Sequence, residues 1–198
     1  MATQLPVTVA VEGSTDTPVA RRLLTHLGLD AGPIHESNGK FRLDRNLLGY
    51  NNAAAHAPWF VLRDLNHDAP CPGALVLHLM PMPASRMCFR IAVRETEAWL
   101  LADREELARY LSVSISQVPN NPEQLEDPKL TLINIARRSR RRAVREDFVP
   151  RVGTSAMVGP GYLARITDYV TRYWRPDVAA ESCRSLAHCL QALHRWNV

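Results

Sequence analysis

The stretch Pro6-Val7-Thr8-Val9-Ala10-Val11-Glu12-Gly13-Ser14-Thr15-Asp16 decides the fold of this chain. Its first half is a short run of β-branched and small apolar residues, which predicts a buried strand at residues 6–11. Glu12 and Gly13 end this strand, and residues 14–16 offer capping side chains for a helix that we expect at residues 17–27. A strand, an acidic turn and a helix in this order are typical of an α/β sheet.

The same pattern recurs further along the chain. Residues 59–62 (WFVL) predict a buried strand that ends just before Asp64, and residues 88–93 (CFRIAV) predict another that ends before Glu95 and Glu97. We expect a brief strand at residues 33–35 and helices at residues 41–56 and 72–79. The alternation of strands and helices predicts the α/β class, with a compact parallel sheet flanked by helices.

Beyond residue 103 the expected elements are helical. Apolar residues spaced three and four apart predict helices at residues 104–111, 130–142, 162–173 and 182–196, and the proline-rich residues 119–128 predict a loop. We therefore divide the chain into an α/β core at residues 1–103 and a helical extension at residues 104–198 that packs on the core.

Acidic residues follow three of the predicted strands. Glu12 follows the first, Asp64 and Asp68 follow the second, and Glu95 and Glu97 follow the third. Because the carboxyl ends of parallel strands meet at one crevice, these carboxylates need a cation between them, and oxygen ligands favour Mg²⁺ or Mn²⁺. Other interpretations stay open: a favourable charge at a helix N-terminus for Glu12, an Asx turn at Asp64, and structural ion pairs for the whole set.

The basic residues of this 198-residue chain are nearly all arginines, and they outnumber the acids enough for a net charge of +4. Only Lys40 and Lys129 are lysines. A GC-rich genome explains such a bias as well as phosphate binding does, so only local clustering counts as an indication. The densest cluster is expected to bind nucleic-acid phosphates, unless it is a solvated helix end; it comprises Arg137, Arg138, Arg140, Arg141 and Arg142.

The cysteines are scattered without metal-ligand or disulfide spacing, which favours a reducing compartment. Residues 1–5 lack the basic flank and apolar core of a signal peptide, and no stretch has the length of a membrane span. We expect a cytoplasmic protein with no membrane contact.

Several motifs together resemble a known family. They are residues 11–16 (VEGSTD), 62–68 (LRDLNHD), 94–103 (RETEAWLLAD), 126–129 (EDPK) and 159–162 (GPGY). In this order they are similar to the Toprim-type proteins related to the OLD nucleases, and most closely to the group called DUF4276. Toprim domains hold Mg²⁺ with a Glu after the first strand and an Asp-x-Asp after a later one, and they cut or join phosphodiesters.

The resemblance implies a Toprim-like core with a metal site built from these motifs. Glu12, Asp64 and Glu97 are the expected metal carboxylates, and either Asn66 or Asp68 assists them. The chain departs from the family pattern at Asn66, where the second acid of Asp-x-Asp is an amide. An amide oxygen can bind Mg²⁺, but it carries no negative charge and cannot act as a general base.

The leading hypothesis is a Mg²⁺-dependent nuclease that cuts DNA or RNA. In this hypothesis Lys129 stabilises charge in the transition state, although it can equally be a surface residue. The family resemblance implies a role in defence against phage or plasmids beside an ATPase partner. A second hypothesis is a weak or inactive module that binds nucleic acid or an ATPase, and a third is an enzyme for a small phosphorylated ligand. Residues 159–161 (GPG) either bind an anion or make a tight connection.

Overall fold

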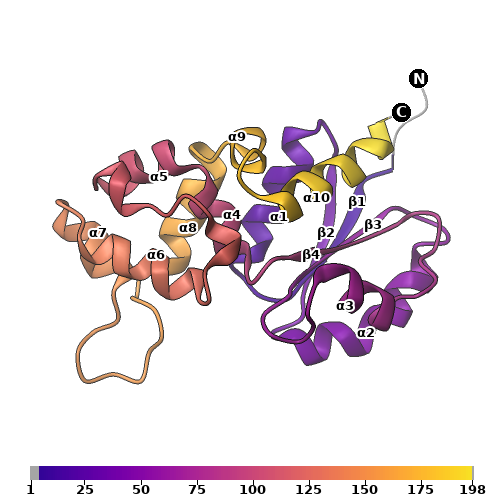
Figure 1. Cartoon of the computed structure of the whole chain (residues 1–198). Coiled ribbons are helices and arrows are strands. Elements are labelled where there is room, and N and C mark those ends of the chain that lie inside the picture. Colours follow the sequence, from indigo (N-terminus) through magenta and orange to yellow (C-terminus); the bar gives the residue numbers. More distant parts are fainter. Residues whose placement is uncertain (1–4, 198) are drawn as a thin grey trace. The chain divides into compact units, whose positions relative to one another are not determined.

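The computed structural model describes residues 5–197, which form two compact units. Unit 1 contains the chain up to Val93 together with the segment from Ser185 onward, and unit 2 contains Arg94–Arg184. The chain therefore leaves unit 1 once and returns to it near its C-terminal end (Figure 1).

Unit 1 is built on a four-stranded parallel sheet with the strand order β2-β1-β3-β4. This sheet confirms the predicted α/β class and its parallel sheet flanked by helices. Its elements are β1 (Val7–Val11), α1 (Asp16–His26), β2 (Ala31–Glu36), α2 (Lys40–Ala53), β3 (Trp59–Asp64), α3 (Pro72–Leu79), β4 (Met87–Ala92), α10 (Arg184–His194) and the 3₁₀ helix η3 (Arg195–Asn197).

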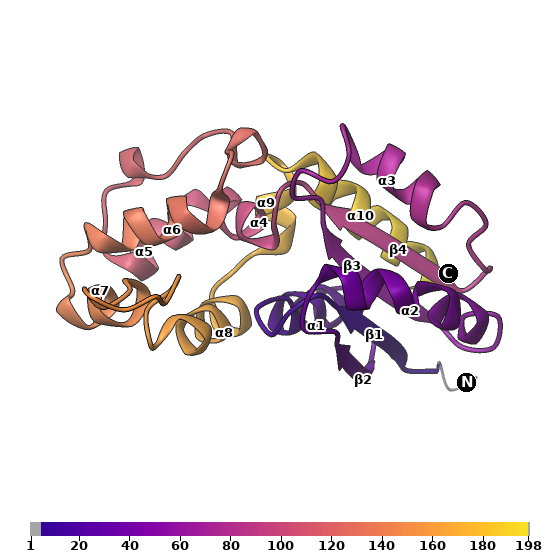
Figure 2. The same cartoon turned by 90° about the horizontal axis from the view of Figure 1, so that it is seen from below.

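Helices cover both faces of the sheet, which explains why its inner strands, β1 and β3, are mostly apolar. On one face, Ala10, Val61 and Phe89 of the strands pack against α2 and α3 through Leu43 and Leu75. On the other face lie α1 and α10 (Figures 1 and 2). The sheet is thus a buried layer whose strand ends remain available for polar residues.

Helix α10 belongs to unit 1, although it comes last in the sequence. Its apolar stripe of Leu186, Cys189 and Leu193 is fully buried, and its Ser185 hydroxyl accepts a hydrogen bond of 3.3 Å from the Val93 backbone N–H. The bounds of the compact units therefore differ from the predicted division at residue 103, because α10 supplies apolar surface that the sheet needs.

Unit 2 consists of short helices around a core of large aromatic side chains. Trp99, Tyr169 and Trp174 are all buried, and the Trp174 indole N–H donates to the Trp99 carbonyl oxygen at 3.2 Å. The elements are α4 (Thr96–Ala102), α5 (Arg104–Leu111), η1 (Ile115–Gln117), η2 (Pro122–Gln124), α6 (Pro128–Arg137), α7 (Arg142–Phe148), α8 (Tyr162–Arg172) and α9 (Pro176–Ala180).

The single helix predicted at residues 130–142 is wrong in its second half. The chain forms α6, then a break at residues 138–141, and then α7. Ser139 causes the break, because its hydroxyl donates to the Leu111 carbonyl oxygen and accepts from the Arg141 backbone N–H at 3.0 Å. Serine side chains compete in this way with the helical hydrogen bonds of the backbone.

Candidate functional site

The candidate site in unit 1 lies at the carboxyl ends of β1, β2 and β3. The chain runs from β1 to β2 on one side and later places β3 on the other side of β1, so the strand order reverses between β1 and β3. In open α/β sheets, ligands bind in the crevice outside the strand ends at such a switch point. Glu12 directly follows β1, and Asp64 is the last residue of β3.

Glu12 lies beside Asp64, as the sequence predicts. The Asp64 backbone N–H donates a hydrogen bond to the Glu12 carboxylate. Burial raises the pKa of the Glu12 carboxyl, and the charges of Arg63 and Lys40 and this hydrogen bond offset that rise only in part. One oxygen of this carboxylate, Glu12 Oε2, is buried without a hydrogen-bond partner in residues 5–197.

A second polar oxygen at this edge comes from Ser37, which the sequence analysis missed. Ser37 follows β2, and its backbone N–H donates to the Val11 carbonyl oxygen at 3.0 Å, which holds it against the end of β1. Its hydroxyl is buried and, like Glu12 Oε2, has no hydrogen-bond partner within the described chain. Only its position after a predicted strand could have indicated it.

Asp16 holds the turn between β1 and α1. Its carboxylate oxygen Oδ2 accepts a hydrogen bond from the Gly13 backbone N–H at 2.9 Å, and the side chain is buried. The acid that the sequence marks as a capping residue therefore fixes the backbone immediately after Glu12. This contact restrains the direction in which the Glu12 side chain leaves the strand.

Asp68 is held in ion pairs at the same end of the sheet. Its two oxygens lie 2.6 Å from Lys40 Nζ and 2.8 Å from an Arg63 nitrogen. Burial acts to raise the pKa of Asp68, but Lys40 and Arg63 lower it below the ordinary value. A ligand role for Asp68 requires these contacts to break, so its assistance at a metal stays a prediction.

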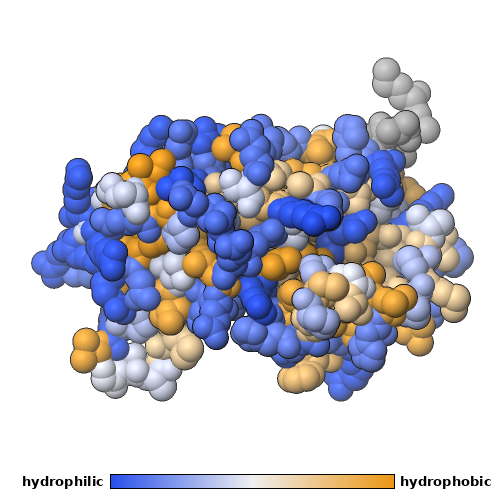
Figure 3. Space-filling view, viewed as in Figure 1, coloured by the Kyte–Doolittle hydropathy of each residue, from blue (hydrophilic) through white to orange (hydrophobic). Residues whose placement is uncertain are grey.

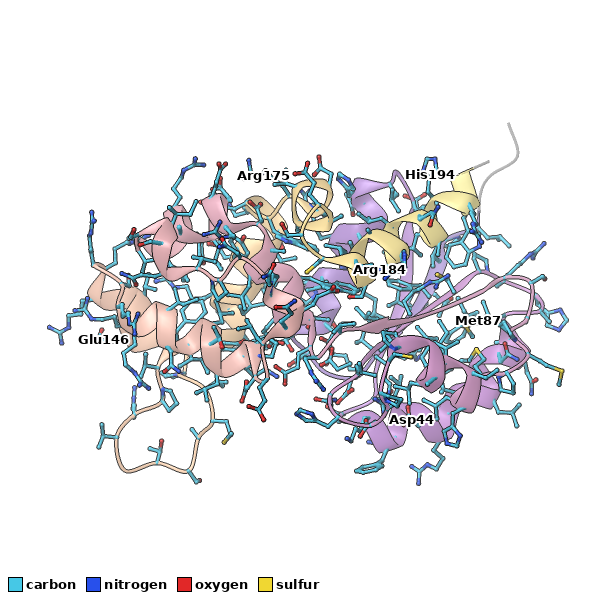
Figure 4. The ribbon with its side chains drawn as sticks, viewed as in Figure 1. Asp44, Met87, Glu146, Arg175, Arg184 and His194 are labelled. Carbon is cyan, nitrogen blue, oxygen red and sulfur yellow. The ribbon has the colours of Figure 1, made fainter. Side chains whose placement is uncertain are left out.

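Arg63 is a buried cation that the sequence analysis did not select. Besides Asp68, its guanidinium contacts both carboxylate oxygens of Asp44 on α2, at 3.0 and 2.9 Å. Figure 4 labels Asp44. This fork-to-fork geometry fixes the guanidinium between two acids. Arg63 therefore contributes positive potential near Glu12 without donating to it, since its donors are engaged elsewhere.

Asn66 occupies a backbone conformation that suits its residue type. Its φ of 49° lies in the left-handed region, which Asn and Asp tolerate better than other residues with a Cβ. The Asp68 backbone N–H donates to the Leu65 carbonyl oxygen at 3.1 Å and closes the turn around it. A ligand role for the Asn66 amide oxygen stays a prediction, and an Asp would fit the same backbone.

The third group of predicted acids, Glu95 and Glu97, lies in unit 2, just before and on the first turn of α4. Glu97 is only 1 % exposed, and Glu95 is the residue that precedes the helix. The Lys129 ammonium lies 3.4 Å from Glu97 and 3.8 Å from Glu95, and the Lys129 backbone N–H donates to Glu95 Oε2 at 3.1 Å. Burial and the charge of Glu97 raise the pKa of Glu95.

Tyr162 completes this group. Its hydroxyl donates to Glu97 Oε1 at 2.9 Å, whereas Glu97 Oε2 is buried without a hydrogen-bond partner in the described residues. Glu97 and Lys129 are in unit 2 and Glu12 and Asp64 are in unit 1. The prediction that Glu97 shares an ion with Glu12 and Asp64, and the catalytic role of Lys129, therefore stay predictions.

The segment Gly159-Pro160-Gly161 is a tight connection in the structure. The N–H groups of Gly159 and Gly161 donate to the carbonyl oxygens of Phe148 and Asp147 at 2.9 and 3.0 Å. A Cβ at Gly159 would lie 2.3 Å from the Asp147 carbonyl oxygen, so only glycine allows this approach. With these N–H groups in use, the second interpretation of the motif holds, and the close packing brings Tyr162 to Glu97.

The arginine cluster lies at the break between α6 and α7. Arg142 pairs with Glu146 on the same helix at 2.7 Å. The other four arginines of the predicted cluster are exposed and form no ion pair with any described residue; these are Arg137, Arg138, Arg140 and Arg141. Unpaired exposed guanidinium groups are the arrangement that phosphate binding requires.

The oxygen donors at the strand ends of unit 1 decide which metal ions they could bind. No group of three or more His, Cys, Asp or Glu side chains within residues 5–197 is placed so that it could hold a metal ion. Mg²⁺, however, commonly takes one or two carboxylates and fills its other positions with waters and substrate phosphates. The unpartnered oxygens of Glu12 and Ser37 are hard donors of this kind, and binding of Mg²⁺ or Mn²⁺ at this edge of unit 1 stays a prediction.

The chain was compared with known proteins. No protein-family model matches it, and no curated protein sequence matches it. Among solved structures, it is similar to the C-terminal region of the Burkholderia pseudomallei OLD protein, with a TM-score of 0.48 and 13 % sequence identity over 96 % of this chain and 98 % of that chain. Membership of the DUF4276 group stays a prediction. None of the described helices combines the length and the apolar character that crossing a membrane requires.

Proposed function

We propose that this protein is a Mg²⁺- or Mn²⁺-dependent nuclease of the Toprim type that hydrolyses phosphodiester bonds in DNA or RNA. One observation carries the proposal: Glu12 Oε2 is a buried carboxylate oxygen without a partner in the described chain, and it lies beside Asp64 at the switch point of a parallel sheet. A buried carboxylate is costly unless a cation or donors satisfy it. The motif resemblance to the OLD-related nucleases supports the same function.

The residues have distinct roles in this proposal. Glu12 and Asp64 bind the metal, and Asp16 restrains the turn that carries Glu12. A bound divalent ion supplies Lewis-acid polarisation of the phosphate and a more acidic water. The unpaired arginines bind the nucleic-acid backbone. A role beside an ATPase partner in defence against phage or plasmids follows from the resemblance alone.

The test is incubation of the purified protein with supercoiled plasmid and with single-stranded DNA and RNA, in Mg²⁺ or Mn²⁺. Glu12→Gln and Asp64→Asn should each remove cleavage, whereas Asp30→Asn should not, because Asp30 is an exposed acid in the same unit and lies before β2. A second readout is Mn²⁺ binding followed by electron paramagnetic resonance, which Glu12→Gln should weaken. Equal cleavage by wild type and both site variants would show that the nuclease assignment is wrong.

The binding module remains the second candidate, and Asn66 together with Asp68 favours it. The amide of Asn66 brings no charge, and both oxygens of Asp68 are occupied by Lys40 and Arg63, so fewer carboxylates remain for a metal. Asn66→Asp separates the two candidates, because the left-handed backbone accepts Asp equally well. A gain of cleavage in this variant indicates a weakened nuclease, whereas nucleic-acid binding without cleavage in both proteins indicates an adaptor.

A further inference from the structure

The loop between α7 and α8 projects from unit 2. It spans residues 149–161 without helix or strand, and residues 151–157 are all exposed (Figure 1). Loops of this length without secondary structure are uncommon in compact domains and are usually functional when they are ordered. Its C-terminal stem is tied down, since Gly159 and Gly161 donate to the last turn of α7.

The outer part of the loop contains an ordered turn. The Thr154 backbone N–H and hydroxyl both donate to the Arg151 carbonyl oxygen, at 3.3 and 2.8 Å, and Gly153 has a φ of 83°. Gly at the third position of a turn permits this positive φ. The turn holds Val152 in the solvent, where its side chain is fully exposed.

Two apolar side chains on this loop are presented to solvent. Besides Val152, Met157 is 83 % exposed, and the space-filling view shows hydrophobic atoms at the end of the projecting loop (Figure 3). Single exposed apolar side chains are normal on a protein surface, so these two gain meaning from their place on a projecting loop whose base is lined by arginines. The loop contains Val, Met, Pro and Ala but no aromatic residue.

Arginines surround the base of the loop. Arg137, Arg145 and Arg151 line the same groove. The acids that also line it, Glu146 and Asp147, are paired with Arg142 and Arg165 at 2.7 Å. Their negative charge is therefore compensated, and the exposed side chain of Arg151 forms no ion pair in the described part of the chain.

We infer that this loop and the arginines at its base form a binding surface for double-stranded DNA. The arginines contact phosphates, and Val152 and Met157 enter the minor groove. Aliphatic and methionine wedges are used by proteins in the minor groove of DNA, whereas single strands are bound by stacking on aromatic rings, which this loop lacks. A-form RNA offers only a wide and shallow minor groove. The inference deepens the proposed nuclease function by assigning a duplex substrate.

The test measures binding without cleavage. Fluorescence anisotropy of a short labelled DNA duplex and of its single strand is recorded with the full-length protein in EDTA. Val152→Ser combined with Met157→Ser should weaken duplex binding about tenfold, because two apolar side chains lose their burial, and should leave single-strand binding unchanged. Met82→Ser is the matched control, since Met82 is 82 % exposed in unit 1.

A salt titration examines the arginine contact. Arg151→Ala should weaken duplex binding and reduce the slope of log K against log salt by about one, as expected for one lost phosphate contact. A minor-groove ligand such as netropsin should displace the wild-type protein. Wild-type duplex affinity in the double serine variant, or an equal loss for duplex and single strand, overturns the inference.

The binding experiments and the cleavage experiments can succeed or fail independently of each other. Asp30→Asn should bind the duplex like the wild type in EDTA, because Asp30 is an exposed acid of unit 1 outside the metal site and the loop. If cleavage is never observed but duplex binding depends on Val152 and Met157, the DNA-binding surface stands and the nuclease does not. If cleavage is observed and the loop variants bind the duplex normally, the nuclease assignment stands and the DNA-binding surface does not.

Discussion

Two buried acids, one in each unit, differ in how far the protein neutralises them. In unit 2, both oxygens of Asp103 are bound by Arg175, which Figure 4 labels. In unit 1, the Glu12 carboxylate receives a backbone hydrogen bond and keeps one buried oxygen without a partner within the described residues, as Glu97 of unit 2 does at its Oε2. Asp103 therefore stabilises the fold through its ion pair, whereas a carboxylate with a buried unpartnered oxygen retains a desolvation cost.

The number of side-chain partners of each acid predicts how much free energy of unfolding is lost when that acid is removed. Asp103 has a cation on both oxygens, Glu97 has a hydroxyl and a lysine near one oxygen, and Glu12 has no direct side-chain donor in the described chain. Removing each acid should therefore cost progressively less free energy of unfolding. Variants that remove each acid in turn test this order.

Asp103→Ala should reduce the free energy of unfolding by about 3 kcal/mol, because it leaves the Arg175 guanidinium without its partner and removes a fully buried acid. Asp103 also accepts from the Arg175 backbone N–H at 3.0 Å, so the link between α4 and α9 weakens with it. Urea denaturation of the full chain measures the change. A loss below about 1 kcal/mol would contradict the structural role of Asp103.

Glu97→Ala should cost about 2 kcal/mol, because the buried Tyr162 hydroxyl loses its acceptor. Glu97→Gln should cost less, since an amide oxygen still accepts from Tyr162. The same urea titrations compare the two variants. Equal destabilisation by Ala and Gln would mean that the charge of Glu97, and not its hydrogen bond, stabilises unit 2.

Glu12→Gln should raise the melting temperature slightly in EDTA above neutral pH, because it removes the penalty of a buried charge. The folded-state pKa of Glu12 is raised above 4.5, so the wild type loses stability as the pH rises from 4.5 through the raised value. The Gln variant lacks this loss, and the difference should vanish at acid pH. Differential scanning fluorimetry across pH measures it.

In Mg²⁺ the wild type should melt at a higher temperature than Glu12→Gln, the opposite of the order expected in EDTA. The ion binds the folded wild type and raises its melting temperature, whereas Glu12→Gln should respond weakly. NaCl at three times the MgCl₂ concentration, which gives the same ionic strength, is the control. If the wild type melts at the same temperature with and without Mg²⁺, the proposed metal site at Glu12 is contradicted.

Arg172→Ala should change the free energy of unfolding least, because it removes an exposed ion pair with Asp168 on one helix. It is the matched control for Asp103→Ala, since both changes break an Arg–Asp pair in unit 2 and differ in the burial of the acid. A cost as large as that of Asp103→Ala would show that burial does not set the order.

Much of unit 1 could be predicted from local sequence. The apolar runs that become β1, β3 and β4 are followed by acidic or capping residues. This pattern predicts that the runs are strands and that Glu12 and Asp64 lie at the carboxyl ends of β1 and β3. The adjacency of Glu12 and Asp64 also follows, because parallel strands end at one edge. The ion pairs of Asp68 could not be predicted, since Lys40 and Arg63 meet it only after α2 packs on the sheet.

The helices after residue 93 were harder to predict. An apolar stripe shows that a helix is buried, but it does not show against which surface, so the pattern of α10 predicts a helix without revealing that it lies in unit 1. The break at Ser139 depends on the Leu111 carbonyl oxygen, which is distant in the sequence. Tyr162 is a similar case, because its contact with Glu97 depends on how tightly Gly159 packs on α7.

The sequence by itself determined the alternation of strands and helices, the parallel sheet, and the acidic residues that follow its strands, because these depend on residue patterns within a few positions. Tertiary structure alone decided which acids are neutralised by the protein and which carboxylate oxygens, those of Glu12 and Glu97 among the described residues, are left unpartnered. Charge pairing depends on side chains brought together from distant segments, and no local pattern encodes those distances. For that reason Glu12, and not Asp68, is the acid on which the proposed metal site rests.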